Sequence, residues 1–250
     1  MPPLLRALSY FRSLAVTVPL AYLSTVAWGT VSLLISAFDS TGRLQHLCAS
    51  YWARTLLFIA GARVTVRGAE NLQPGRAYVY AANHQSYFDI PVAFAYLPAN
   101  FRIMAKASLF HIPFLGWHLR RSGHMPIARH NPRRAARSLL EAATHVREGT
   151  SVFVFPEGGR SPDGALKEFK AGTFLLAIKA GVPVIPVTLN GTRAVLRMNS
   201  FHVHPGRVEL ILHPPVSTDG MRSHSADALC SQVRDIIASS YDESSAVSAD

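Results

Sequence analysis

The sequence Ala77-Tyr78-Val79-Tyr80-Ala81-Ala82 runs directly into Asn83-His84-Gln85-Ser86-Tyr87-Phe88-Asp89, so a histidine follows an apolar run. The apolar run combines aromatic and β-branched side chains without charge or proline, which predicts a short buried strand. The histidine then lies where this strand ends and a helix expected over Tyr87 to Leu97 begins. A side chain at such a junction can be exposed to a substrate while the backbone behind it stays fixed.

His84 and Asp89 allow two interpretations. Imidazole has an ordinary pKa close to neutrality, and a carboxylate on one ring nitrogen fixes the tautomer and stabilises the imidazolium. Positions five apart lie on different faces of a regular helix, so this pair can meet only across a strand-to-helix bend. Alternatively, Ser86 to Asp89 fits the S-x-x-D capping box, in which Asp89 only satisfies backbone donors at the helix start.

From Ala62 onward, short apolar strands alternate with amphipathic helices. This pattern predicts a single α/β domain over residues 62–240, with a mixed, mostly parallel sheet flanked by helices. The polar tail, 241–250, is expected to be flexible. The expected strands are Arg63–Arg67, Ala77–Ala82, Phe101–Ala105, His124–Ile127, Ser151–Phe155, Val184–Leu189 and Val208–His213. Besides Tyr87–Leu97, the expected helices are Pro132–Arg147, Thr173–Ala180 and Ala226–Ser239.

The N-terminal segment, residues 1–61, is predicted to be a membrane-associated pair of helices. Leu14 to Phe38 carries no charged side chain, and about 20 apolar residues suffice to span a bilayer. Pro19 and Gly29 can break this run into pieces that dip into one leaflet, so both spanning and dipping remain open. A second apolar stretch, Leu47 to Ala60, contains Trp and Arg, which anchor helices at a membrane interface.

Composition indicates an anionic, lipid-like partner. The chain has 250 residues, a formal net charge of +10 and a sequence pI of about 10.1. Hydrophobic residues make up 49%, which is high for a basic protein and favours lipid over nucleic acid. Cys48 and Cys230 lie far apart in apolar contexts, so neither a disulfide framework nor a cysteine metal site is expected, and a reducing compartment is favoured.

Several familiar signatures of catalysis and binding are missing from the sequence. It contains no G-x-S-x-G nucleophile elbow, no G-x-x-x-x-G-K-[ST] phosphate loop, no G-x-G-x-x-G and no H-E-x-x-H. His202 and His204 alternate on one face of an extended segment, but no third ligand is identifiable. No metal is therefore expected.

Basic groups follow other predicted strands. Lys106 can reach a phosphate as a point charge or can simply be solvated, and Arg129 can likewise bind phosphate or face water. The strand that ends at Phe155 runs into Pro156-Glu157-Gly158-Gly159-Arg160. Here the glycines permit close backbone approach to a ligand, and arginine suits bidentate phosphate binding. The alternative for this turn is a purely structural Glu/Arg ion pair.

Four ordered motifs carry a resemblance to a known family: N-H-x4-D at Asn83–Asp89, G-x-x-P-x-x-R at Gly123–Arg129, F-P-E-G-x-R at Phe155–Arg160 and V-P-V-I-P-V at Val182–Val187. The chain resembles the 1-acyl-sn-glycerol-3-phosphate acyltransferases, a glycerolipid acyltransferase family, over about Val64–Val195. It departs modestly from the family pattern, with His-Met-Pro in the second motif and a Gly in the third where Thr is commoner.

The resemblance implies transfer of a fatty acyl group to the sn-2 hydroxyl of lysophosphatidic acid, giving phosphatidic acid. Acyl-CoA or acyl carrier protein would be the donor substrate, with no other cofactor and no nucleic-acid partner. His84 is implied as general base and Asp89 as the residue that orients it. The acceptor site is implied at Lys106 and Arg160 for the phosphate, Arg129 as a helper, and Glu157 and Gly158 as residues that shape the pocket.

The implied location is the inner or cytoplasmic membrane, with the catalytic domain facing the cytoplasm. Three alternatives remain open. Related enzymes acylate glycerol 3-phosphate or another lysolipid. A non-catalytic lipid-binding protein can keep the same fold, although it needs no base. A hydrolase can use the same histidine to activate water, although an apolar acyl tunnel tends to exclude water.

Overall fold

A seven-stranded mixed sheet forms the centre of the molecule, which we describe from a computed structural model over residues 3–128 and 131–243. The strand order is β1-β7-β6-β2-β5-β3-β4. Strands β6, β2, β5, β3 and β4 run parallel, whereas β7 is antiparallel to β6 and parallel to β1. The predicted fold class is confirmed. The strands are β1 Ala62–Arg67, β2 Val79–Ala82, β3 Phe101–Lys106, β4 Met125–Ile127, β5 Ser151–Val154, β6 Val184–Asn190 and β7 Gly206–Leu212.

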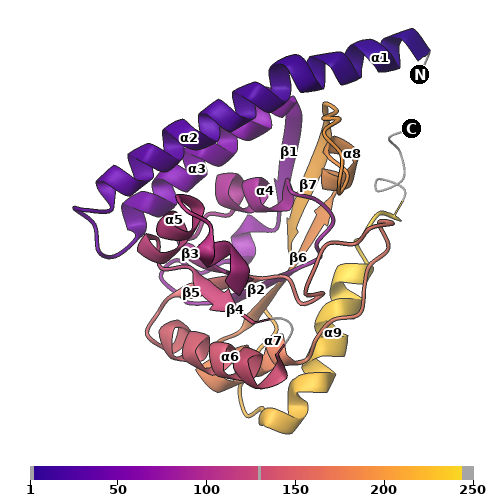
Figure 1. The fold of residues 1–250 in the computed structure, drawn as a ribbon. Helices are drawn as coiled ribbons and strands as arrows, with labels where there is room; N and C mark the ends of the chain where they lie inside the picture. The colour runs from indigo at the N-terminus through magenta and orange to yellow at the C-terminus, as the bar shows by residue number, and fades with distance from the viewer. Residues whose placement is uncertain (1–2, 129–130, 244–250) are drawn as a thin grey trace.

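Helices cover both faces of the sheet (Figure 1). Because side chains alternate along a strand, Tyr80 and Ala82 of β2 join one buried cluster with residues of α3 and α4, while Val79 and Ala81 join a second with α6, α7 and α9. The helices of the domain are α3 Arg43–Ala60, α4 Asp89–Tyr96, α5 Leu115–Arg121, α6 Pro132–Arg147, α7 Gly172–Ala180, α8 Thr192–Val195 and α9 Ala226–Ala238, with 3-10 turns at Ala69–Asn71, Ala107–His111 and Ser223–Ser225.

The sequence predicted α6 well and missed α5. Asn131 caps α6 by accepting a hydrogen bond of 3.0 Å from the backbone N–H of Arg134, as an N-cap should. The helix Leu115–Arg121 was not predicted because it is short and lies between two proline-containing segments. Its buried residues are Gly116 and Leu119. Their burial depends on neighbours that the fold brings close and not on a local sequence pattern.

The first helix is continuous from Pro3 to Ile35, so neither Pro19 nor Gly29 breaks it, a possibility that the sequence had left open. It consists of α1 (Pro3–Arg12), a π-helical turn (Ser13–Thr17) and α2 (Val18–Ile35). A proline ring presses on the carbonyl four residues before it. The wider π turn lies at that position, so the backbone accommodates Pro19 without a break.

The two N-terminal helices differ in how they contact the domain (Figure 1). Helix α3 packs on the sheet and contributes Ala53 and Leu57 to the first buried cluster, so it is part of the domain's core. Helix α2 lies along α3 and α5. Only Ser32 of α2 is buried, and its outer side exposes large apolar residues, namely Leu20, Tyr22, Leu23, Val26, Val31 and Leu34.

The predicted flexible tail begins with residues that make specific contacts. The Tyr241 hydroxyl donates a hydrogen bond to the Gly164 carbonyl, and the Asp242 backbone N–H donates to Asn190 Oδ1 at 3.0 Å. The part of the chain that packs on the domain therefore extends past residue 240. Residues 244–250 of the predicted tail lie outside the described residues.

Candidate active site

The loop that carries His84 is fixed at its start by Asn83. The Asn83 side chain donates to the Leu189 carbonyl at 2.9 Å and accepts from the Leu189 N–H at 2.8 Å. Asn83 is fully buried, and β6 lies directly beside β2. This paired contact replaces the next ladder step between the two strands and fixes the backbone immediately before His84.

His84 and Asp89 meet across the predicted strand-to-helix bend. His84 Nδ1 lies 2.7 Å from Asp89 Oδ2, and the Asp89 side chain is fully buried. The same oxygen accepts the backbone N–H groups of Gln85 and Ser86, at 2.7 and 2.8 Å. Asp89 therefore accepts backbone donors of the loop before α4 and holds the imidazole at the same time. The N-cap of α4 is Phe88, without a side-chain cap bond, so the capping box expected at Ser86 does not form as such.

This contact assigns the histidine tautomer. An ionised carboxylate only accepts hydrogen bonds, so His84 Nδ1 carries the proton that Asp89 accepts. The Nε2 atom is then left with a lone pair that can accept a proton from a substrate. Ser86 Oγ bonds the Leu196 carbonyl at 2.7 Å, and in the described part of the chain no hydroxyl or thiol bonds the His84 ring.

The third motif holds the backbone of His84 from the neighbouring strand β5. Glu157 Oε1 accepts the His84 N–H at 2.7 Å, and the Ser161 N–H donates to the His84 carbonyl at 2.9 Å. The Phe155 ring stacks on the imidazole, with ring centroids 3.8 Å apart. The turn after β5 thus fixes His84 from three sides.

Glu157 is buried, and burial raises the pKa of its carboxyl from the ordinary value of 4.5 to about 7, with a further increase from the nearby Asp89 carboxylate. The hydrogen bond from the His84 N–H opposes this shift. Among the described contacts, Glu157 bonds His84 and not Arg160, so the structural Glu/Arg ion pair considered from sequence does not form.

Arg160 instead lies over an aromatic ring. Its guanidinium carbon is 3.7 Å from the centroid of the Tyr87 ring, a favourable cation–π geometry. The Nε atom is buried and, within the described chain, has no hydrogen-bond partner. The stacked guanidinium is thus held on the His84 loop with unused donor capacity, which an anion can take.

The structure says less about the other two predicted phosphate-binding residues, Lys106 and Arg129. Lys106 lies exposed at the carboxyl end of β3, the same edge of the sheet as His84 but two strands away. No described contact joins Lys106 to the His84 loop. Arg129 lies outside the described residues.

The described part of the second motif is structural. Gly123 has φ +72°, and the buried His124 ring accepts the Ile103 N–H at 3.1 Å through Nδ1. Burial lowers the pKa of His124 well below its ordinary value, so its ring is neutral and links β4 to β3.

Lys170 is a basic residue at this site that belongs to none of the four motifs. Gly158 has φ +74°, and a Cβ atom built there would lie 2.9 Å from Lys170 Nζ. The Lys170 backbone N–H bonds the Pro156 carbonyl at 3.0 Å. The only available signal in the sequence was a lysine placed shortly before the helix that follows the glycine-rich turn.

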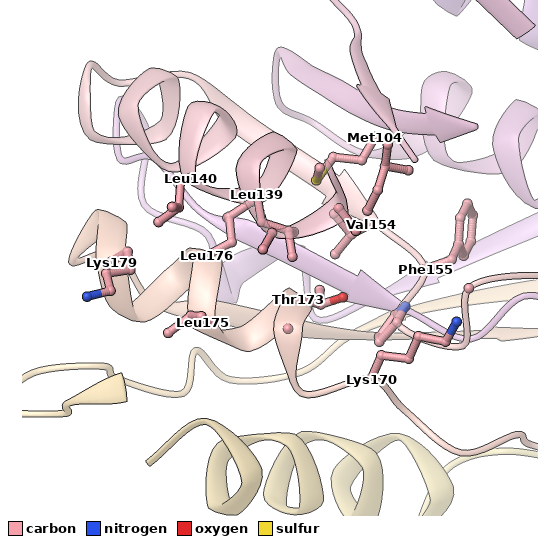
Figure 2. A pocket seen from close by; sticks show the side chains of 16 residues that line it. Met104, Leu139, Leu140, Val154, Phe155, Lys170, Thr173, Leu175, Leu176 and Lys179 are labelled. Atoms are coloured by element: carbon pink, nitrogen blue, oxygen red, sulfur yellow. The ribbon is translucent and has the colours of Figure 1, made fainter. Parts of the chain in front are cut away.

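Two apolar cavities flank the sheet near the carboxyl ends of its parallel strands. The first, the α2–α5 cavity, has a volume of about 280 Å³ and is lined mainly by Thr25, Trp28, Gly29, Ser32, Cys48, Ala49, Trp52, Ile90, Phe94, Ile103, Phe114, Leu115, His118, Leu119 and His124. The second, the α6–α7 cavity, has a volume of about 320 Å³ and lies between α6 and α7 (Figure 2). The fourth motif, Val182 to Val187, lines neither of these cavities.

Comparison with known proteins gives consistent matches. A family model described as acyltransferase matches residues 63–190. The chain is 36% identical to the chloroplastic 1-acyl-sn-glycerol-3-phosphate acyltransferase of Arabidopsis thaliana, over 80% of this chain and 55% of the relative. It is also 36% identical to the 1-acyl-sn-glycerol-3-phosphate acyltransferase of Chlamydomonas reinhardtii, over 94% of this chain and 69% of the relative. The chain thus spans about half the length of the Arabidopsis protein.

A solved structure matches nearly the whole molecule. It is the crystal structure of the 1-acyl-sn-glycerophosphate (LPA) acyltransferase from Thermotoga maritima, with a TM-score of 0.78 and 30% sequence identity. The match covers 92% of this chain and 94% of that chain. The match therefore includes most of the N-terminal helices as well as the sheet.

Proposed function

This chain belongs to the 1-acyl-sn-glycerol-3-phosphate acyltransferase family, and we propose that it transfers a fatty acyl group to the sn-2 hydroxyl of lysophosphatidic acid. The product is phosphatidic acid, and the donor is a thioester of coenzyme A or acyl carrier protein. The observation that carries the proposal is the buried His84–Asp89 pair beside the stacked guanidinium of Arg160. Such a site joins a base with an anion-binding group.

In the proposed mechanism, His84 Nε2 removes the proton from the sn-2 hydroxyl as its oxygen attacks the thioester carbonyl carbon. The new C–O bond forms, the C–S bond breaks, and the leaving thiolate takes the proton from the imidazolium. Asp89, bonded to Nδ1 at 2.7 Å, stabilises the imidazolium between these steps. No acyl-enzyme intermediate is required.

Positioning supplies the larger share of the rate. Holding hydroxyl, base and thioester in attack geometry lowers the barrier by roughly 7 to 11 kcal/mol, whereas general-base catalysis adds about 10²- to 10⁴-fold. Asn83, Glu157 and Ser161 fix the backbone of His84 through hydrogen bonds of 2.7 to 2.9 Å. We assign them a positioning role.

The acceptor phosphate is proposed to bind Arg160 and Lys106, with Arg129 as a helper and Glu157 and Gly158 shaping the pocket. The unused donor capacity of the Arg160 guanidinium supports this assignment, as does its place on the turn that holds His84. Lys170, beside Gly158, adds a further positive charge to the same turn.

The donor's acyl chain is proposed to enter the α2–α5 cavity. Its lining includes Ile90 and Phe94 of α4, the helix that begins with Asp89. The other wall is formed by α2, whose outer side is apolar and exposed. An acyl chain leaving the membrane can therefore reach the base along an apolar path.

Membrane association is proposed to occur by insertion into one leaflet of the inner or cytoplasmic membrane, with the domain on the cytoplasmic side. The Pro3–Ile35 helix is long and apolar enough to cross a bilayer. However, α2 packs along α3 and α5 of the catalytic domain, and a spanning orientation would draw polar parts of that domain into hydrocarbon. The buried, unpaired Cys48 and Cys230 suit a reducing compartment.

The function is tested by thiol release from palmitoyl-CoA and from palmitoyl acyl carrier protein, with and without lysophosphatidic acid, using wild type and His84→Ala. We expect release that depends on the acceptor and is lost in the variant. Release without acceptor would identify a thioesterase instead. No turnover with glycerol 3-phosphate or any lysolipid tried, despite lipid binding, would favour a non-catalytic lipid-binding protein.

A further inference from the structure

We propose that the α6–α7 cavity binds the 1-acyl chain of the lysophosphatidic acid acceptor, so that the two fatty chains approach His84 from opposite faces of the sheet. This inference rests on the proposed function. The proposed reaction brings together two fatty chains, one on the donor and one on the acceptor. The α6–α7 cavity gives the acceptor's chain a site of its own.

The cavity is built for an apolar ligand. Its volume of about 320 Å³ is within the range of small-molecule sites, roughly 300 to 1,000 Å³. Figure 2 shows Leu139 of α6 and Leu176 of α7 beside Met104 and Val154 from the sheet. The lining also includes Ile127, Ala135, Ala136, Leu140, Gly172, Thr173 and Leu175.

One end of the cavity reaches the catalytic loop. Phe155, Pro156 and Gly158 line the cavity, and they flank Glu157, which bonds the His84 N–H at 2.7 Å. The Phe155 ring also stacks on the His84 imidazole. The cavity therefore begins at the turn that positions the base.

Charge assigns the cavity to the acceptor. Lysophosphatidic acid carries its chain and its phosphate on the two carbons that flank the reacting hydroxyl. An apolar cavity and a cation must therefore both lie near the base. Lys170 lies at the catalytic end of the cavity beside Gly158, and Lys179 lies at the other end (Figure 2). In the acceptor the phosphate is one carbon away from the reacting hydroxyl, whereas the phosphates of either donor are separated from its thioester by the pantetheine arm, so a chain that binds beside Lys170 is the acceptor's.

The two cavities lie on opposite faces of the sheet. Leu139, Met104 and Val154 belong to or pack on the second buried cluster, whereas Phe94 and Ile103 of the α2–α5 cavity belong to the first. Two chains bound in this way do not compete for space. The sn-2 hydroxyl and the thioester then meet at the carboxyl edge of the sheet, where His84 lies.

The test separates acceptor from donor selectivity. Ala135→Phe and Leu139→Trp fill the α6–α7 cavity, and we expect each to lower kcat/KM at least tenfold for an oleoyl acceptor but less than twofold for a hexanoyl acceptor. The donor chain-length profile should not change. The matched variant is Gly29→Ala, whose added Cβ would lie 2.6 Å from the Phe114 ring in the other cavity, and it should alter the donor profile only.

Equal losses with both acceptors in a folded variant, or a change in the donor profile alone, would overturn the assignment. Photolabelling of the wild type, with a lysophosphatidic acid that carries a diazirine at the chain end, covers the case in which the variants fail to fold. We expect adducts in 132–147 or 172–180, and adducts confined to residues 3–60 would contradict the proposal. A wild type that labels in α6 and α7 but does not acylate lysophosphatidic acid would refute the proposed function alone.

Discussion

At the scale of single residues, one oxygen atom organises the candidate active site. Asp89 Oδ2 accepts from His84 Nδ1 and from the N–H groups of Gln85 and Ser86. A carboxylate oxygen with several donors is held in one position. The geometry of the proposed base, His84, thus depends on the same atom that shapes the turn.

Asp89→Asn is expected to lower kcat by about 10²- to 10⁴-fold, the contribution of a correctly oriented general base. The amide can donate to Nδ1 and so select the wrong tautomer. The double variant with His84→Ala should be no slower than His84→Ala alone, because the two residues act as a unit. Additive losses in steady-state rates would show that they act separately.

Glu157 is expected to make the stability of the protein depend on pH. Its pKa is about 7 when folded against an ordinary 4.5, so the folded chain binds this proton more tightly than the unfolded chain. The free energy of unfolding should therefore fall by roughly 3 kcal/mol as pH rises from 4.5 to about 7. Glu157→Gln keeps an acceptor for His84 and should flatten this slope in urea denaturation, and an unchanged slope would contradict the assignment.

Arg160 is expected to act on the acceptor alone. Arg160→Lys keeps the charge but loses the planar fork and much of the stacking on Tyr87. We expect the KM for lysophosphatidic acid to rise about tenfold in Arg160→Lys and further in Arg160→Ala, with the KM for the acyl donor unchanged. An equal rise in both KM values would instead indicate a general distortion of the site.

At the scale of elements, α3 and α2 have different tasks although both are apolar. Helix α3 buries Ala53 and Leu57 in the core, so a deletion reaching Ala60 is expected to unfold the domain. Helix α2 exposes its apolar side. The proposed membrane contact is therefore better tested by substitutions on α2 than by truncation.

The double substitution Leu23→Glu and Leu34→Glu should weaken binding to lipid vesicles at least tenfold, because each places a charge where an apolar chain would enter the leaflet. The melting temperature should change little, since both side chains are more than 60% exposed. Ser231→Glu, at an exposed position of α9, is the control and should leave vesicle binding intact. Unchanged sedimentation of the α2 variant would relocate the membrane contact.

At the scale of the whole molecule, the net charge of +10 should steer the protein to anionic surfaces. Binding to vesicles containing phosphatidylglycerol is expected to weaken as salt rises from 50 to about 500 mM, because the Debye length shortens to a few ångströms. Binding to phosphatidylcholine vesicles should depend little on salt, since the apolar side of α2 is then the main contact. Equal salt dependence with both lipids would count against this division.

Local apolar patterns and short-range spacing were enough to predict the strands and the order of the four motifs. They also predicted that the chemistry-bearing residues follow strands. The spacing of His84 and Asp89 already required a bend. The sequence pattern could not predict that the first helix continues past Pro19, because the continuity depends on a local π turn.

Which of these groups meet depends on how the strands pair and the helices pack. The sheet order places β2 between β5 and β6, so Glu157 bonds the His84 backbone, where the sequence equally allowed a pair with Arg160. The same order places α6 and α7 together over one face, which creates a cavity that no local pattern predicts. These contacts join residues far apart in the chain, and they arise from strand pairing and side-chain packing across the whole domain.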